Sequence, residues 1–169
     1  LQEMVAKENE RNRQRKQPEV TTEQVRERYG QTYREMMKEI QTTLAELGKR
    51  FPPYQGQGHE IAGFVWFQGW NDLISAPFAD AYAGNLERFI RDVRKDLGVP
   101  NLPFVIGQCG QNGFKPAQGG MLKVKDAQAA MEKVPDFQGN VKVVATDPFW
   151  DPDADKLIDG WQKHQEEWK

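Results

Sequence analysis

Three short runs of apolar residues, separated by stretches with helical periodicity, constrain the fold of this chain most strongly. Residues 61–67 are too few for a helix, are rich in β-forming residues and show no polar alternation, which is typical of a parallel strand covered on both faces. Residues 102–110 and 141–147 predict two further strands. Because a helix-forming stretch lies between each pair of runs, we expect a three-layer α/β/α fold with a parallel sheet.

The helical stretches are predicted from apolar residues that recur at intervals of three and four. A long amphipathic helix is expected to end at Gly48, and Thr21 and Gln24 have the spacing of a capping box at its start. Its apolar positions are Val25, Tyr29, Tyr33, Met36, Met37, Ile40, Leu44 and Leu47. Further helices are expected between the strands, and Pro152 with Asp153 predicts the start of a last one.

The first residues of the chain differ in composition from the rest. Residues 1–17 mix both signs of charge with little periodic apolar content, and Pro18 follows them. We therefore predict a charged, solvated arm or helix over residues 1–20 and an α/β domain over residues 21–169. The chain begins with Leu1 instead of Met, so we expect it to be a piece of a longer polypeptide.

Composition and charge argue against several classes of function. The formal net charge of -2 and the pI near 5.8 create no field that would gather phosphates, so we expect no nucleic-acid partner. No run approaches the ~18 consecutive apolar residues of a membrane span, so no membrane association is expected. The single cysteine, Cys109, allows no internal disulfide and is interpreted as a small buried residue in preference to a nucleophile.

Polar and glycine residues follow each predicted strand. The first strand leads into Gln68, Gly69, Asn71 and Asp72, and the other two lead into residues 107–112 and into Thr146 and Asp147. The carboxyl ends of parallel strands meet at one edge of a sheet, so these loops are expected to face a shared crevice. Neutral amide donors suit an oxygen that becomes negative only in a transition state. The alternative is ordinary turn chemistry, in which Asn71 and Asp72 cap the next helix.

The stretch "GFVWFQGWND", residues 63–72, resembles the third conserved block of the SGNH hydrolase superfamily. The closest resemblance is to the sialate O-acetylesterase and acetylxylan esterase branch, in which a strand ends in Trp-x-Gln-Gly before an acidic or amide residue. The likeness runs from about residue 54 to residue 108 and continues more weakly to the end of the chain. It implies an SGNH-type, flavodoxin-like hydrolase fold, which this chain would form incompletely.

The resemblance implies an esterase that removes acetyl groups from carbohydrate hydroxyls with a serine nucleophile, a histidine and an oxyanion hole. It assigns oxyanion donors to Gln68 and Asn71, a tight turn and a backbone donor to Gly69, and support of the loop to Asp72. Substrate contacts would come from Trp70 and Gln108. The implied partner is an acetylated carbohydrate, without cofactor, and such substrates favour an exported protein over a cytoplasmic one.

The nucleophile and histidine blocks of the superfamily are missing from this sequence. Its one serine, Ser75, lies in the same loop as Asn71, and one short loop cannot easily present both nucleophile and oxyanion donor to a carbonyl. His59 precedes the first strand, and His164 has an aspartate five residues before it instead of three. We therefore expect both catalytic groups outside this chain, in the remainder of its own polypeptide or in a partner subunit.

Other functions remain open at this stage. A non-catalytic α/β module could bind glycan or a protein through exposed tryptophans among Trp66, Trp70, Trp150 and Trp161. A flavodoxin-like nucleotide binder is disfavoured because no glycine-rich phosphate loop follows any strand. A calcium site is disfavoured because the aspartates of residues 147–155 lack the glycine and distal glutamate of an EF-hand loop, so no metal is expected.

Overall fold

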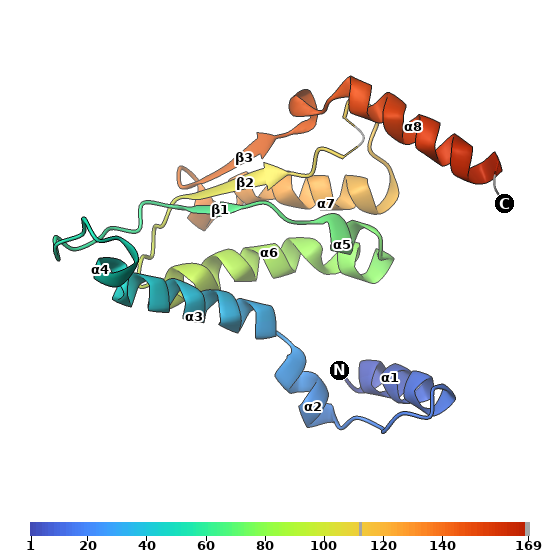
Figure 1. Cartoon of the computed structure of the whole chain (residues 1–169), viewed down its shortest axis with the longest axis horizontal. Coiled ribbons are helices and arrows are strands. Elements are labelled where there is room, and N and C mark those ends of the chain that lie inside the picture. The colour runs from blue at the N-terminus through green and yellow to red at the C-terminus, as the bar shows by residue number, and fades with distance from the viewer. Residues whose placement is uncertain (112, 168–169) are drawn as a thin grey trace. The chain divides into compact units, whose positions relative to one another are not determined.

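The computed structural model describes residues 1–111 and 113–167 of the chain (Figure 1). It divides into two compact units, Leu1–His59 and Glu60–Lys169, which are treated separately below. The first unit is entirely helical in its regular structure, and the second is mixed α/β. None of the helices in the described residues has the length and apolar character needed to cross a membrane. The boundary predicted near residue 20 stays a prediction.

The first unit contains four helices. They are α1 (Gln2–Gln14), α2 (Thr22–Arg28), α3 (Gln31–Ala45) and α4 (Leu47–Arg50). The predicted charged segment forms α1, which buries no residue.

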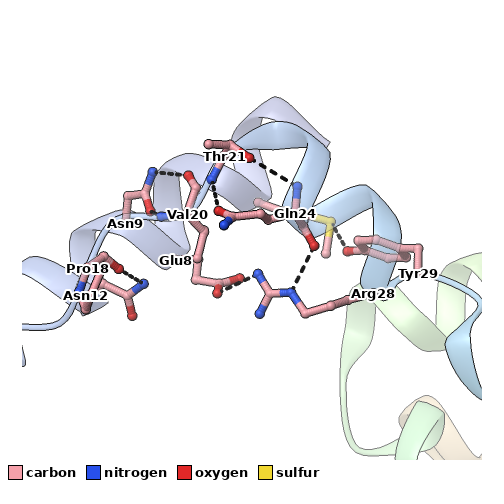
Figure 2. Close-up of polar contacts among 10 residues, drawn as sticks. Glu8, Asn9, Asn12, Pro18, Val20, Thr21, Gln24, Arg28 and Tyr29 are labelled. Atoms are coloured by element: carbon pink, nitrogen blue, oxygen red, sulfur yellow. Dashed lines mark hydrogen bonds and ion pairs between the residues drawn. The ribbon is translucent and has the colours of Figure 1, made fainter.

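Side-chain hydrogen bonds connect α1 to α2 (Figure 2). Asn9 brackets the backbone of Val20: its Nδ2 donates to the Val20 carbonyl at 2.9 Å, and its Oδ1 accepts from the Val20 N–H at 2.7 Å. Arg28 pairs with Glu8 at 2.9 Å. The segment between the two helices is therefore held to α1 by hydrogen bonds from the Asn9 side chain to its backbone. The helices themselves bury little apolar surface.

The capping box at Thr21 and Gln24 is confirmed. The Thr21 hydroxyl accepts from the Gln24 N–H at 3.2 Å, and the Gln24 side chain accepts from the Thr21 N–H at 2.8 Å (Figure 2). Two N–H groups that the first helical turn leaves without intrahelical partners are thereby satisfied.

The prediction of one long helix that ends at Gly48 is wrong. The chain leaves the helix at Tyr29, and Gly30 adopts the left-handed conformation at φ 69°, which a residue without a Cβ tolerates. Arg34 then donates to the Tyr29 carbonyl at 2.8 Å, which satisfies an acceptor at the end of α2. Gly48 lies inside α4 instead of ending a helix.

The second unit contains a parallel three-stranded sheet, as predicted (Figure 1). Its strands are β1 (Phe64–Trp66), β2 (Phe104–Gln108) and β3 (Val141–Ala145), with β2 in the middle. The register pairs Phe64 with Phe104 and Phe104 with Val141. Side chains on one strand therefore lie beside side chains of the same face on the next strand.

The remaining elements of this unit are helical. They are α5 (Trp70–Leu73), α6 (Ala76–Asp96), α7 (Gly119–Ala130), α8 (Pro152–Glu167) and the 3-10 turns η1 (Met131–Lys133), η2 (Pro135–Phe137) and η3 (Asp147–Phe149). The predicted start of the last helix is confirmed: α8 begins at Pro152, and the Asp151 carboxylate accepts from the Asp153 N–H at 2.9 Å.

The core of this unit lies between one face of the sheet and the helices α6 and α7, which run along that face (Figure 1). Phe89 of α6 contacts the rings of Phe64, Trp66 and Phe104 at centroid separations of 5.8, 4.3 and 6.3 Å. The strands supply aromatic and β-branched side chains on this face because alternate residues point the same way.

The other face of the sheet is open, so the expectation that residues 61–67 are covered on both faces is wrong. Val65 and Phe67 are 74% and 67% exposed, and Val105 and Val144 on the neighbouring strands are 38% and 42% exposed. These positions alternate along the strands with buried or half-buried ones. Periodicity alone did not reveal this because all the residues involved are apolar.

Two helical glycines provide a test of the packing between α5 and α7. A Cβ on Gly120 of α7 would lie 2.0 Å from the Leu73 carbonyl oxygen, whereas a Cβ on Gly84 of α6 would meet nothing within 4 Å. We expect Gly120→Ala to destabilise the protein by about 1–3 kcal/mol, because backbone must move. Gly84→Ala should stabilise it by about 0.5–1 kcal/mol, the usual gain in a helix interior. Chemical denaturation measures both, and equal effects of the two substitutions would contradict the packing described here.

Candidate functional site

A hollow of about 220 Å³ lies at the carboxyl end of the sheet, where β1 and β2 run out. It is lined by Phe67, Gln68, Gly69, Trp70, Asn71, Cys109 and Gln111. The three predicted oxyanion-hole residues, Gln68, Gly69 and Asn71, therefore share one concave surface with the predicted substrate contact Trp70. Cys109 and Gln111, which follow β2, complete the lining.

The side chain of Gln68 is held by Asp72, the residue predicted to support the loop. Gln68 Nε2 donates to Asp72 Oδ2 at 2.6 Å. A carboxylate only accepts hydrogen bonds, so this contact fixes which end of the Gln68 amide is the nitrogen. One hydrogen of the amide serves Asp72, and the second is left for another acceptor. Asp72 thus orients the Gln68 donor.

Asn71 and Trp70 lie on the exposed side of the hollow. Asn71 is exposed, and Trp70 is 54% exposed. Both belong to α5, a single turn that begins directly after Gly69. Among the described residues nothing hydrogen-bonds the Asn71 carboxamide, so it is available to an external oxygen.

Gly69 allows the loop after β1 to contact the loop after β2. Its φ of 155° and its lack of a side chain permit a close approach, since a Cβ at this position would lie 2.6 Å from Cys109 Sγ. It would also lie 3.0 Å from Val124 Cγ1 of α7. The predicted tight turn is therefore also a packing requirement.

Three other polar residues at the predicted strand ends, Gln108, Thr146 and Asp147, do not line this hollow. Gln108 Nε2 donates to the Lys125 carbonyl of α7 at 2.9 Å, so its carboxamide holds a helix to the sheet. Thr146 donates to the Gln108 carbonyl at 2.6 Å. Asp147 pairs with Lys125 at 2.6 Å. Two of the three predicted strand ends thus share the hollow, and a substrate contact from Gln108 stays a prediction.

The sequence's serine and histidines lie elsewhere. Ser75 is the residue before α6 and is half-buried, whereas His59 and His164 are exposed. None of the three lines the hollow described above. Among the side chains that the structure describes, no group of three or more from His, Cys, Asp and Glu is arranged to hold a metal.

Gln128 and Tyr82, which contact the loop after β1 from the interior of the unit, were not identified from the sequence. The Tyr82 hydroxyl and Gln128 Nε2 both donate to the Gln68 carbonyl, at 2.7 and 2.9 Å. Burial raises the pKa of the Tyr82 hydroxyl, so it remains a protonated donor at neutral pH. The available signal was a glutamine beside the apolar stripe of α7, between Ala127 and Met131.

A comparison with protein families shows to which family this chain belongs. A sequence model of the family described as "Carbohydrate esterase, sialic acid-specific acetylesterase" matches residues 19–155. This chain belongs to that family. The resemblance seen in the sequence is thereby confirmed, and the chain is an esterase-like hydrolase domain of the sialic acid-specific acetylesterase family.

One plant protein is similar to this acetylesterase-family chain in both sequence and structure. The probable carbohydrate esterase At4g34215 of Arabidopsis thaliana is 38% identical over 48 residues, which are 28% of this chain and 18% of that protein. The X-ray structure of At4g34215 matches 70% of this chain at 28% identity and a TM-score of 0.50. The chain spans 41% of that crystallised chain. The expected parallel α/β fold is confirmed as an incomplete SGNH-type fold.

Proposed function

We propose that this chain supplies the oxyanion-binding part of a carbohydrate O-acetylesterase that removes acetyl groups from sugar hydroxyls. In this reaction a serine hydroxyl attacks the acetyl carbonyl, a histidine moves the proton, and hydrogen-bond donors stabilise the oxyanion of the tetrahedral intermediate. Gln68 and Asn71 would donate to that oxygen, with the Gly69 N–H as a third donor. Trp70 and Gln108 would contact the sugar.

The observation that carries this proposal is the preorganised carboxamide of Gln68. Asp72 holds it at 2.6 Å, and the exposed Asn71 lies at the same hollow. Donors fixed before the reaction stabilise developing negative charge without reorganising, which is the main source of catalysis in such sites. Neither donor carries a charge of its own that would attract anions in the ground state.

The nucleophile and the base are proposed to come from residues outside this 169-residue sequence, in the remainder of its own chain or in a partner subunit. Ser75 is the one serine of the sequence, and it does not line the hollow. The proposed substrate class favours an exported protein over a cytoplasmic one, and cofactor, nucleic acid and membrane have no part in this proposal.

The experiment that tests this function compares the 169-residue chain with the complete enzyme. We expect the complete enzyme to hydrolyse p-nitrophenyl acetate and to react covalently with a fluorophosphonate probe. The chain by itself should do neither, because it presents donors without a nucleophile. Turnover by the chain that is lost in Ser75→Ala would overturn the assignment of the nucleophile.

The second candidate function is a non-catalytic glycan-binding module. It is favoured by the exposed rings of Trp70 and Trp161, which are 54% and 62% exposed and could stack on sugar faces. Titration of acetylated and deacetylated sugars onto the chain separates the two functions. Binding to both sugars by an inactive complete protein would favour the module.

A further inference from the structure

The loop that lines the hollow rests on one buried amide, the side chain of Gln128. Gln128 lies in α7 and is 0% exposed. Its Oε1 accepts from the Cys109 N–H at 3.0 Å, and its Nε2 donates to the Gln68 carbonyl at 2.9 Å. An N–H can only donate and a carbonyl can only accept, so these two contacts allow only one orientation of the amide. A single side chain therefore connects the ends of β1 and β2.

The Gln128 side chain also contacts the Tyr82 hydroxyl and the Cys109 thiol, which lie on the interior side of the loop. Nε2 lies 3.3 Å from the Tyr82 hydroxyl and 3.6 Å from Cys109 Sγ. The Tyr82 hydroxyl itself donates to the Gln68 carbonyl at 2.7 Å. A buried amide is costly unless its polar atoms are paired, and here they are paired with the backbone of the predicted site. Packing alone would be served as well by an apolar residue.

The two hydrogen bonds to the Gln68 carbonyl determine the direction of the next N–H. The peptide between Gln68 and Gly69 is planar and trans, so its carbonyl and its N–H point in opposite directions. The carbonyl points toward Gln128 and Tyr82 in the interior. The Gly69 N–H therefore points away from them, and Gly69 lines the hollow.

We propose that Gln128 is a positioning residue that aims the Gly69 N–H into the hollow by holding the Gln68 carbonyl and the Cys109 N–H at a fixed separation. The inference rests on the proposed function for its catalytic consequence. The hydrogen-bonded clamp itself does not depend on that function. Gln128 does not touch the substrate, and its effect reaches the reaction through the Gln68–Gly69 peptide.

The clamp is tested on the 169-residue chain by the reactivity of its single thiol. Cys109 is 2% exposed, and we expect its reaction with a thiol-reactive disulfide reagent to accelerate about tenfold or more in Gln128→Leu, because the loop opens more often. Burial raises the pKa of the Cys109 thiol, and the hydrogen bond from Gln128 lowers it. If Gln128→Leu removed this hydrogen bond and the loop stayed closed, the thiol pKa would rise and the reaction would slow, because less thiolate would be present. A faster reaction therefore indicates that the loop opens.

The control for this measurement is Gln118→Leu. Gln118 is the exposed residue directly before α7 and makes no side-chain capping bond, so the same substitution there should leave the thiol reactivity unchanged. An equal rate in wild type and Gln128→Leu would overturn the clamp. An equal acceleration in Gln118→Leu would also overturn it, since the effect would then be unspecific.

The catalytic consequence is tested in the complete enzyme with Gln128→Leu and Gln128→Glu. We expect kcat to fall roughly 10- to 100-fold in Gln128→Leu with little change in KM, because a misaimed donor affects the transition state and not substrate binding. Glu at this position keeps the acceptor for Cys109 but can donate to the Gln68 carbonyl only when it is protonated. Burial raises the pKa of such a carboxyl group.

The ratio of Gln128→Glu activity to wild-type activity should therefore be highest at acidic pH and fall as the pH rises through that raised pKa. Gln128→Leu should show no such change in its ratio. A Gln128→Leu enzyme with wild-type kcat, when Asn71→Ala is impaired, would overturn the positioning role and leave the proposed function intact. Wild-type kcat in both variants would reject the proposed function instead. The thiol reactivity of Cys109 would then still show whether Gln128 holds the loop closed.

Discussion

Asn71→Ala is expected to reduce kcat of the proposed complete esterase by roughly 10² to 10³-fold, the usual cost of removing one oxyanion donor. The loss should appear in kcat with little change in KM, because the acetyl oxygen is not yet negative in the bound substrate. Asn71 is exposed, so the substitution should leave the melting temperature unchanged. Steady-state hydrolysis of an acetylated sugar measures the effect.

Two further variants separate a lost donor from a disturbed loop. Asn71→Asp keeps the size of the side chain but replaces the donor by a negative acceptor, so its activity should be at least as low as that of Asn71→Ala. Gln68→Ala should show a loss of the same order. Ser75→Ala is the control within the same segment and should retain full kcat. Activity within about twofold of wild type in both Asn71→Ala and Gln68→Ala would remove the oxyanion assignment, since each donor should cost far more.

Arg94→Ala is expected to destabilise the protein by about 3 kcal/mol, because it leaves buried acceptors without donors. Arg94 is 5% exposed on α6. Its Nε and Nη2 donate to the Leu102 carbonyl at 3.1 and 3.0 Å, and its Nη2 donates to Asn140 Oδ1 at 2.6 Å. Its guanidinium also lies 5.0 Å from the centroid of the Phe137 ring. One side chain thus ties α6 to the segments that lead into β2 and β3.

Thermal melting followed by circular dichroism measures this loss, which should lower the melting temperature by about 10 °C or more for a unit of this size. Arg94→Lys should recover little, because an ammonium group cannot donate in the planar fork that reaches both acceptors. Arg91→Ala is the control one turn away. Its ion pairs with Glu87 and Asp136 are exposed, so its melting temperature should change little. Similar melting temperatures for the Arg94→Ala and Arg91→Ala variants would contradict the structural role of Arg94.

Much of the regular structure could be predicted from local patterns. The three strands and the capping box at Thr21 follow from residue types within short windows, and the structure contains them. The parallel pairing, also observed, followed from the helix expected between each pair of strands. The break at Gly30 was missed because the apolar period of Val25, Tyr29 and Tyr33 continues across it. A hydrophobic period records which residues share a face, and it does not record whether the backbone between them stays helical.

Part of the candidate site was likewise predictable. Gln68, Gly69 and Asn71 lie within four consecutive positions, so a turn at the end of a strand brings them together whatever the rest of the fold does. The contact between Gln68 and Asp72 is also local. Gln108 illustrates the limit of this reasoning. It lies at the carboxyl end of β2, as expected, but its carboxamide donates to the Lys125 carbonyl of α7 and does not line the hollow.

The order of strands and helices and the neutral amide residues after the first strand could be read from neighbours a few positions apart. The parallel sheet followed from that order, because a helix lies between each pair of strands. The tertiary structure alone decided that Gln128, 60 residues from Gln68, supports that loop together with Tyr82 and Cys109. It also decided that Val65 and Phe67 face outward. Contacts of this kind depend on the register between strands and on the rotation of each helix about its axis, which no local pattern specifies.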